Sequence, residues 1–130
     1  MLVPDMARTS RRQVTSAADG SQPPVRQEDP TLDEVVRRIV TTLRPERVYL
    51  FGSRARGEVG PDSDYDLLVV VTEARDPTHH LSQQAHAALW GMGVSADILV
   101  WTRRGFEERL GVVASLPALV MREGRLLYAA

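Results

Sequence analysis

Apolar residues recur every three or four positions between residues 31 and 43, which is typical of an amphipathic helix with one buried face. Thr31 followed by Glu34 predicts a capping box, in which each side chain satisfies a free N–H of the first turn. Pro45 ends the helical pattern because proline cannot continue a helix. The chain therefore begins its folded part with a helix near residue 31.

Three later segments have the continuous apolar character of buried strands. They are residues 47–51, 65–72 and 95–101, each rich in β-branched or aromatic side chains. The second is nearly all apolar after its first two residues, so we expect it to be central in a sheet. Residues 57–63 contain Gly, Pro and Asp and are predicted to form a loop between the first two strands.

The remaining pattern predicts three helices and an edge strand. One helix begins after Asp76 and Pro77 and runs to about residue 90, and a short one is capped by Thr102. A third begins at Ser115 and ends at Gly124, and residues 125–128 form the last strand. The order helix, strand, strand, helix, strand, helix, helix, strand predicts an α+β fold, a mixed sheet flanked by helices.

The first 28 residues differ in composition from the rest of the chain. They are rich in Ser, Gln, Pro, Arg and Ala, contain no aromatic residue and follow neither a helical nor a strand period. This composition predicts a flexible tail, with residues 29–130 as the folded domain. An alternative is a basic arm built on Arg8, Arg11 and Arg12 that contacts a partner.

Composition excludes several kinds of chemistry. The 130 residues include no cysteine, so disulfides, thiolate metal sites and cysteine nucleophiles are ruled out. They include no lysine, which excludes a Schiff base and a P-loop lysine. A net charge of −1 argues against a general nucleic-acid or membrane-surface binder. Without a membrane-length apolar stretch or a signal peptide, we expect a soluble cytoplasmic protein.

Gly52 and Ser53 follow the first predicted strand, where the chain must turn sharply. A glycine there lets the backbone approach a ligand closely. The amide groups and the serine hydroxyl that follow can then donate to phosphate oxygens. The alternative is a turn with no ligand, because strands often end in this way.

Acidic residues lie at the starts of the other two predicted strands. Asp64 and Asp66 project to one face with Tyr65 opposite, because side chains alternate along a strand. Asp97 is the lone acid of the third strand and can reach the same place if the two strands are neighbours. Carboxylates this close repel each other unless a cation lies between them, and oxygen ligands suit Mg²⁺. The alternative is a polar turn and a solvated strand end.

The stretch LFGSRARG at residues 50–57, followed by SDYDL at residues 63–67, resembles the signature of the minimal nucleotidyltransferases (MNT) of the DNA polymerase β superfamily. A third acid on a later strand fits the same pattern, and the resemblance extends over residues 31–128. It implies the nucleotidyltransferase fold, a small mixed β-sheet flanked by helices. It also implies a Mg²⁺-dependent nucleotidyltransferase that transfers AMP from ATP to a hydroxyl group.

The resemblance also implies roles for the acids. Asp64 and Asp66 would hold two Mg²⁺ ions, which stabilise the attacking and leaving oxygens of the displacement. Asp97 would hold the catalytic ion and accept the proton of the attacking hydroxyl.

Four residues of the first motif would bind the nucleotide. Gly52 and Ser53 would cradle the β- and γ-phosphates, and Arg54 and Arg56 would neutralise triphosphate charge. The sequence leaves open which of the two arginines points inward and whether either is a solvated surface residue.

Larger members of the superfamily carry an additional substrate-binding domain, for which this chain has no room. Stand-alone members, the MntA-like antitoxins, pair with a HEPN ribonuclease toxin, and some of them modify a tyrosine of that toxin. The resemblance therefore implies a protein hydroxyl on a HEPN-type toxin as acceptor, with this chain as its antitoxin in a complex. Two alternatives stay open: a binding module that neutralises its partner without catalysis, and a small-molecule transferase completed by dimerisation.

Overall fold

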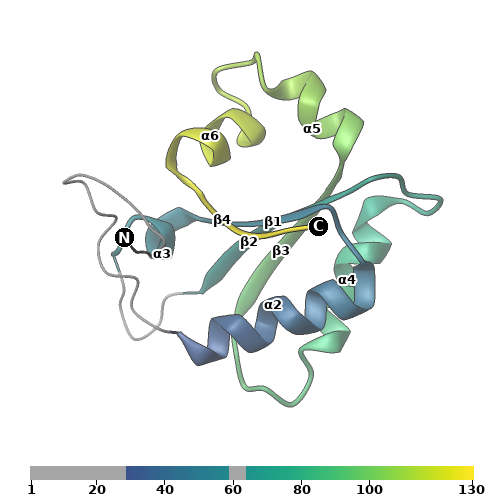
Figure 1. Ribbon diagram of the computed structural model, residues 1–130, viewed down its shortest axis with the longest axis vertical. Coiled ribbons are helices and arrows are strands. Elements are labelled where there is room, and N and C mark those ends of the chain that lie inside the picture. Colours follow the sequence, from purple (N-terminus) through teal and green to yellow (C-terminus); the bar gives the residue numbers. More distant parts are fainter. Residues whose placement is uncertain (1–28, 59–63) are drawn as a thin grey trace, which may run out of the picture.

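The computed structural model describes residues 29–58 and 64–130, which form a mixed sheet with helices on both faces (Figure 1). The strands are β1 (Arg47–Phe51), β2 (Tyr65–Val71), β3 (Ala96–Thr102) and β4 (Arg125–Ala129). The helices are α2 (Pro30–Leu43), α3 (Gly52–Ala55), α4 (Thr78–Ala88), α5 (Arg103–Arg109) and α6 (Leu116–Glu123). The predicted α+β fold is confirmed. The predicted tail, the basic arm and most of the predicted loop at residues 57–63 lie outside the described residues.

The sheet has the strand order β3-β2-β1-β4. Strand β1 is antiparallel to both β2 and β4, whereas β2 and β3 are parallel and are joined through α4. The predictions of a central second strand and of an edge position for the last strand are therefore confirmed. Because β1 runs in the opposite direction to β2 and β3, the end of β1 meets the starts of β2 and β3 at one end of the sheet.

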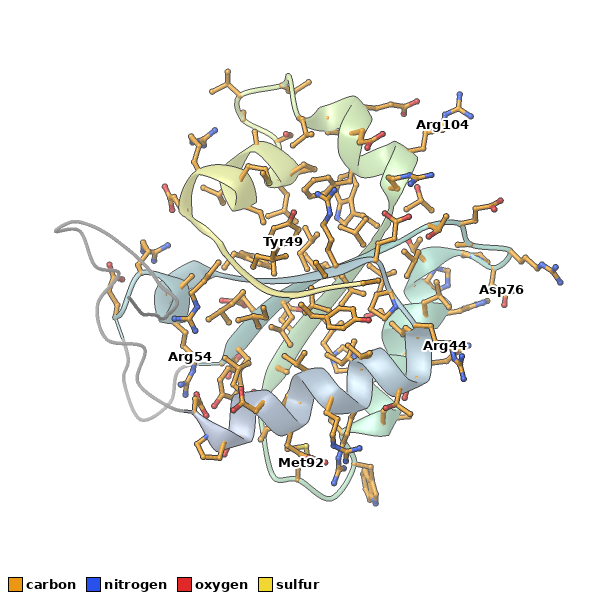
Figure 2. All side chains as sticks on the ribbon, in the orientation of Figure 1. Arg44, Tyr49, Arg54, Asp76, Met92 and Arg104 are labelled. Atoms are coloured by element: carbon orange, nitrogen blue, oxygen red, sulfur yellow. The ribbon has the colours of Figure 1, made fainter. Side chains whose placement is uncertain are left out.

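Helices cover the sheet in two layers, with α5 and α6 on one face and α2 and α4 on the other (Figure 1). Between the sheet and α2 and α4 lies the larger core cluster, which includes Ile39, Leu67 and Ile98. On the opposite face Tyr49 stacks on Phe106 with ring centroids 5.8 Å apart, and Figure 2 shows Tyr49 on this side of the sheet. Burial of both faces explains the continuous apolar character of β2.

Helix α2 begins before the predicted capping box. Asp29 is the N-cap residue, and its Oδ1 accepts a hydrogen bond from the backbone N–H of Leu32 at 3.0 Å. Pro30 follows it at the first helical position. Glu34 instead pairs with two arginines of its own helix. The capping box at Thr31 is therefore wrong, because an aspartate followed by proline already starts and caps the helix.

Helix α4 covers the outer edge of β3. The Ser82 hydroxyl donates to the carbonyl oxygen of Ile98, and the His86 ring nitrogens lie 2.8 Å from the Ser82 carbonyl oxygen and 3.0 Å from that of Ala96. These contacts occupy carbonyl groups at a sheet edge that would otherwise be available to another strand.

Within the described parts of the chain, no helix has both the length and the apolar character needed to cross a membrane.

Candidate active site

The structure brings the predicted carboxylates to one end of the sheet. Asp66 on β2 is paired in register with Asp97 on the parallel strand β3, and on its other side with Phe51, the last residue of β1. Residues paired in register present their side chains on the same face. Asp64 immediately precedes β2, and Tyr65 packs in the core on the opposite face, as the alternation predicts.

The surroundings of Asp66 change the pKa of its carboxyl group. Partial burial raises its pKa, and the negative charges of Asp97 and Asp64 raise it further. The positive charge of Arg56 acts in the opposite direction. Like charges at short range disfavour the ionised form, and a bound cation would relieve the negative charge concentrated at this end of the sheet.

The three carboxylates suit a divalent cation in donor type and in charge. Asp64 and Asp97 are exposed and Asp66 is half-buried, so their oxygens are accessible. Their side chains are not closed around one position, since no group of three His, Cys, Asp or Glu within residues 29–58 and 64–130 could hold a metal ion as placed. The residues fit the expected metal in chemistry, while the side-chain geometry is open.

Gly52 lies directly against this carboxylate. Its φ of +75° is in the region that glycine adopts most readily, and a Cβ built on it would collide with Oδ2 of Asp66 and lie 3.1 Å from its Cγ. Two properties of glycine are therefore needed here at once, the backbone conformation and the missing side chain. The turn after β1 and the acidic start of β2 are in direct contact because this residue is glycine.

Strand β1 leads without a linker into α3, a single turn that the sequence analysis did not predict. Four residues are too few for a helical period to be recognised. Ser53 is half-buried in this turn, and its carbonyl oxygen accepts from the N–H of Glu58 at 2.8 Å and of Arg56 at 3.1 Å. Phe51, at the N-cap, supplies no side-chain hydrogen bond to the turn. Backbone hydrogen bonds therefore hold the C-terminal end of the turn that carries Ser53.

The two arginines of the motif point to different places. The Arg54 guanidinium lies over the Tyr65 ring, 4.2 Å from its centroid, and 4.0 Å from Oδ2 of Asp29. Figure 2 shows it between α3 and the start of α2. It therefore lies toward the sheet face that carries Tyr65, not the face that carries the carboxylates.

Arg56 is the arginine whose charge acts on the carboxylates. It pairs with Glu58 at 3.3 Å and with Glu123 at 3.7 Å, at the end of α6. The hydrogen bond to Glu58 is the largest cause of its raised pKa, and Asp66 contributes in the same direction. Of the two candidates, Arg56 is the one on the carboxylate side.

The contacts of Asp29 and Glu123 in this region were not predicted from the sequence. The Asp-Pro pair at residues 29 and 30 is a recognisable helix start and could have located the cap. Nothing in the sequence links Asp29 to Tyr65 or Glu123 to Arg56, since these contacts join distant segments.

Two hollows of the described surface lie along β3 and away from the carboxylates. One, of about 440 Å³, lies between β3 and α4 and includes Thr78, Ser82 and Leu99 in its lining. The other, of about 670 Å³, is lined by the end of α4 and by the segment that leads to Ala96. Neither of these two hollows is lined by Asp64, Asp66 or Asp97.

Comparison with known protein families identifies the family of this chain. Residues 32–123 match the family model described as the nucleotidyltransferase domain, and the chain therefore belongs to this family. The match includes the whole of the two motifs and all three carboxylates. A comparison with the curated proteins gave no match.

Solved structures resemble the chain at low sequence identity. A proposed nucleotidyltransferase from Sulfolobus solfataricus has a TM-score of 0.53 and 22% identity over 77% of this chain and 78% of that one, which shows a shared fold. A toxin–antitoxin structure with AMP-PNP has a TM-score of 0.49 and 20% identity, over 75% and 73% of the two chains. A complex of a tri-AMPylated Shewanella oneidensis HEPN toxin with an MNT antitoxin has a TM-score of 0.41 and 19% identity, over 78% and 69%.

Proposed function

We propose that this protein is a Mg²⁺-dependent nucleotidyltransferase that transfers AMP from ATP to a hydroxyl group of a protein. The observation that carries the proposal is the position of Asp66, against Gly52 on one side and paired with Asp97 on the other. A triphosphate bound at the turn after β1 would have its reacting phosphorus beside these carboxylates. Membership of the nucleotidyltransferase family supports the reaction class.

The carboxylates would hold the metal. Asp64, Asp66 and Asp97 offer the hard oxygen donors that Mg²⁺ prefers, and their mutual repulsion favours its binding. When bound, two Mg²⁺ ions would stabilise the charge on the attacking and leaving oxygens. This role explains why negative charge is concentrated at one end of the sheet despite its cost.

The turn after β1 would hold the nucleotide. The backbone at Gly52 and the amide and hydroxyl of Ser53 would donate to the β- and γ-phosphates. Arg56 would add a positive charge on the same side, and a guanidinium fits phosphate oxygens in a bidentate way. Its present partners, Glu58 and Glu123, are exposed side chains that a triphosphate could replace.

In the reaction the acceptor oxygen forms a bond to the α-phosphorus as the bond to the bridging oxygen breaks. Pyrophosphate leaves with that electron pair, and AMP stays on the acceptor. Asp97 would accept the hydroxyl proton, since its side chain is exposed beside Asp66 near the start of β3.

We extend the proposal to the acceptor, a tyrosine hydroxyl on a HEPN-type toxin for which this chain is the antitoxin. The motif at residues 50–57 and 63–67 supports this, since it resembles that of stand-alone antitoxins that act on such partners. The open position of the carboxylates also supports it, because Asp64 and Asp97 are exposed where the surface of another protein can reach them.

A labelling experiment tests the proposal. The full chain is incubated with MgCl₂, ATP labelled on the α-phosphate and a HEPN protein encoded beside it. We expect label on the HEPN protein, and none when the γ-phosphate carries the label, because that phosphate leaves in pyrophosphate. The Asp64→Asn and Asp66→Asn variants should lose labelling, whereas Asp76→Asn, an exposed acid before α4, should keep it.

Two results would count against the proposal in different ways. Labelling that persists in Asp66→Asn contradicts the assigned role of the carboxylates. The second result is inhibition of the partner's ribonuclease activity without labelling, by the wild type and the Asp64→Asn/Asp66→Asn variant equally. That result would favour a binding module that needs no catalysis.

A further inference from the structure

We propose that Asp29, Tyr65 and Arg54 form a positioning cluster that sets the turn at α3 against the acidic start of β2, and that Arg54 acts through Tyr65 instead of touching the triphosphate. This inference rests on the proposed function, because it assigns roles within that site. It gives different roles to Arg54 and Arg56, which are only two positions apart in the same motif.

Tyr65 links the cluster to the carboxylates. It is the residue between Asp64 and Asp66, and its side chain enters the opposite core with only 7% of its surface exposed. Its hydroxyl donates to Asp29, 2.9 Å from Oδ2 and 3.2 Å from Oδ1. Because neighbouring side chains alternate along a strand, a fixed Tyr65 also fixes the direction in which both acids project.

Arg54 links the cluster to the phosphate turn. It is one residue after Ser53, and its guanidinium is stacked 4.2 Å above the centroid of the Tyr65 ring. The negative charge of Asp29, 4.0 Å from Nη1, favours the same position. A cation over an aromatic face that is largely removed from water is a stabilising arrangement, and the Arg54 side chain is only 19% exposed. This contact holds α3 at a set position relative to β2.

Asp29 serves two elements at once. Its Oδ1 caps α2 through the N–H of Leu32, while its carboxylate also receives the Tyr65 hydroxyl. Hydrogen bonding and burial together raise the pKa of Tyr65, with burial the larger cause, so the hydroxyl keeps its proton and its role as donor. The cluster therefore joins α2, α3 and β2 on the face that the carboxylates do not occupy.

Kinetics of four variants test the inference. Arg54→Met keeps a side chain that packs on the ring but removes the charge, and Tyr65→Phe removes only the hydroxyl. We expect each to lower kcat for labelling by about tenfold and to change KM for ATP less than about threefold, because the phosphate contacts stay. The double variant should be no worse than the poorer single one, since both changes break one unit. Arg56→Met, the matched comparison, should raise KM.

The opposite pattern overturns the inference. An Arg54→Met protein whose KM rises about tenfold with kcat unchanged, or a double variant whose losses multiply, would show that Arg54 contacts the nucleotide independently of Tyr65. Thermal unfolding of each variant checks its folding. If Arg54→Met does not fold, Arg54→Lys replaces it, since lysine keeps the charge but lacks the planar group that covers the ring.

Failure of the proposed function gives a different result. If the wild-type protein labels no acceptor, calorimetric binding of Mg²⁺-ATP still tests the cluster. Arg54→Met should then bind within about threefold of the wild type and Arg56→Met about tenfold more weakly. A large loss of ATP binding in Arg54→Met would overturn the inference whether or not transfer occurs.

Discussion

Asp66 of β2 lies in register with Asp97 of the parallel strand β3, and the same carboxylate packs against the bare Cα of Gly52. One side chain thus connects the acidic ends of two strands with the turn that follows a third. The arrangement has an electrostatic cost, because burial and the charges of Asp97 and Asp64 raise the pKa of Asp66. The proposed binding of Mg²⁺ beside Asp66 would offset this cost.

Replacement of Gly52 by alanine should disturb the site and the fold together. The residue has φ +75°, and a Cβ would strike the Asp66 carboxylate. We expect a loss of about 1–2 kcal/mol in the free energy of unfolding from the backbone conformation, and a fall in transfer of about a hundredfold from the displaced carboxylate. Urea denaturation and the labelling rate measure the two effects.

Gly57→Ala is the matched control for Gly52→Ala. Gly57 has φ +80°, yet an added Cβ would meet no atom within 4 Å. This variant should show a similar loss of stability but keep most of its transfer activity. Equal loss of transfer in both variants would mean that backbone strain, and not the contact with Asp66, explains the effect.

Removal of the Asp66 charge should stabilise the protein when no metal is present. In a buffer with a chelator at neutral pH, Asp66→Asn should melt a few degrees above the wild type, because it removes the repulsion from Asp97 and Asp64. Addition of Mg²⁺ should raise the melting temperature of the wild type but not that of the variant. Equal stabilisation of both by Mg²⁺ would place the metal elsewhere.

The N-cap of α2 can be tested with a pair of substitutions. Asp29→Ala removes the cap and the acceptor for Tyr65, and should cost at least about 1 kcal/mol in the free energy of unfolding. Thr31→Ala should change stability little, because Thr31 is exposed and does not cap the helix. Chemical denaturation of both variants compares their free energies of unfolding. A larger loss in Thr31→Ala than in Asp29→Ala would mean that Thr31, and not Asp29, caps the helix.

Glu34 predicts a pH dependence of stability. Hydrogen bonds from Arg37 and Arg38 lower the pKa of its carboxyl from 4.5 to about 2. The folded state therefore favours the ionised form, and the resulting stabilisation is present above about pH 4.5 and is lost as the pH falls toward 2. The wild type should be more stable than Glu34→Gln at pH 7, and melting curves of the two should converge near pH 2. A difference that stays constant across this range would exclude the ion pairs as its cause.

Much of the fold could be predicted from local patterns. The order of strands and longer helices follows from apolar spacing and from residues such as Pro45 and Gly124 that end elements. The short turn α3 was missed because it is shorter than any helical period. The capping box was a wrong choice between two local signals, since Asp29 with Pro30 precedes Thr31 and captures the start of the helix.

The candidate site was predictable in its residue types but not in its contacts. The spacing of Gly52, Asp64 and Asp66 indicates phosphate and metal chemistry, and the parallel pairing of β3 with β2 confirms that Asp97 lies beside Asp66. The sequence does not distinguish Arg54 from Arg56, because both follow the same turn. Their separation depends on Tyr65 and Asp29 on one side and Glu123 on the other.

The sequence by itself determined the strands and the longer helices, the acidic residues at the strand starts and the nucleotidyltransferase motif, because these depend on local spacing and residue type. Only the tertiary structure decided which carboxylates meet, that Gly52 must lack a side chain beside Asp66, and that Arg54 and Arg56 serve opposite faces of the sheet. The physical reason is strand pairing: hydrogen bonds between distant segments set the register, and the register brings these side chains together.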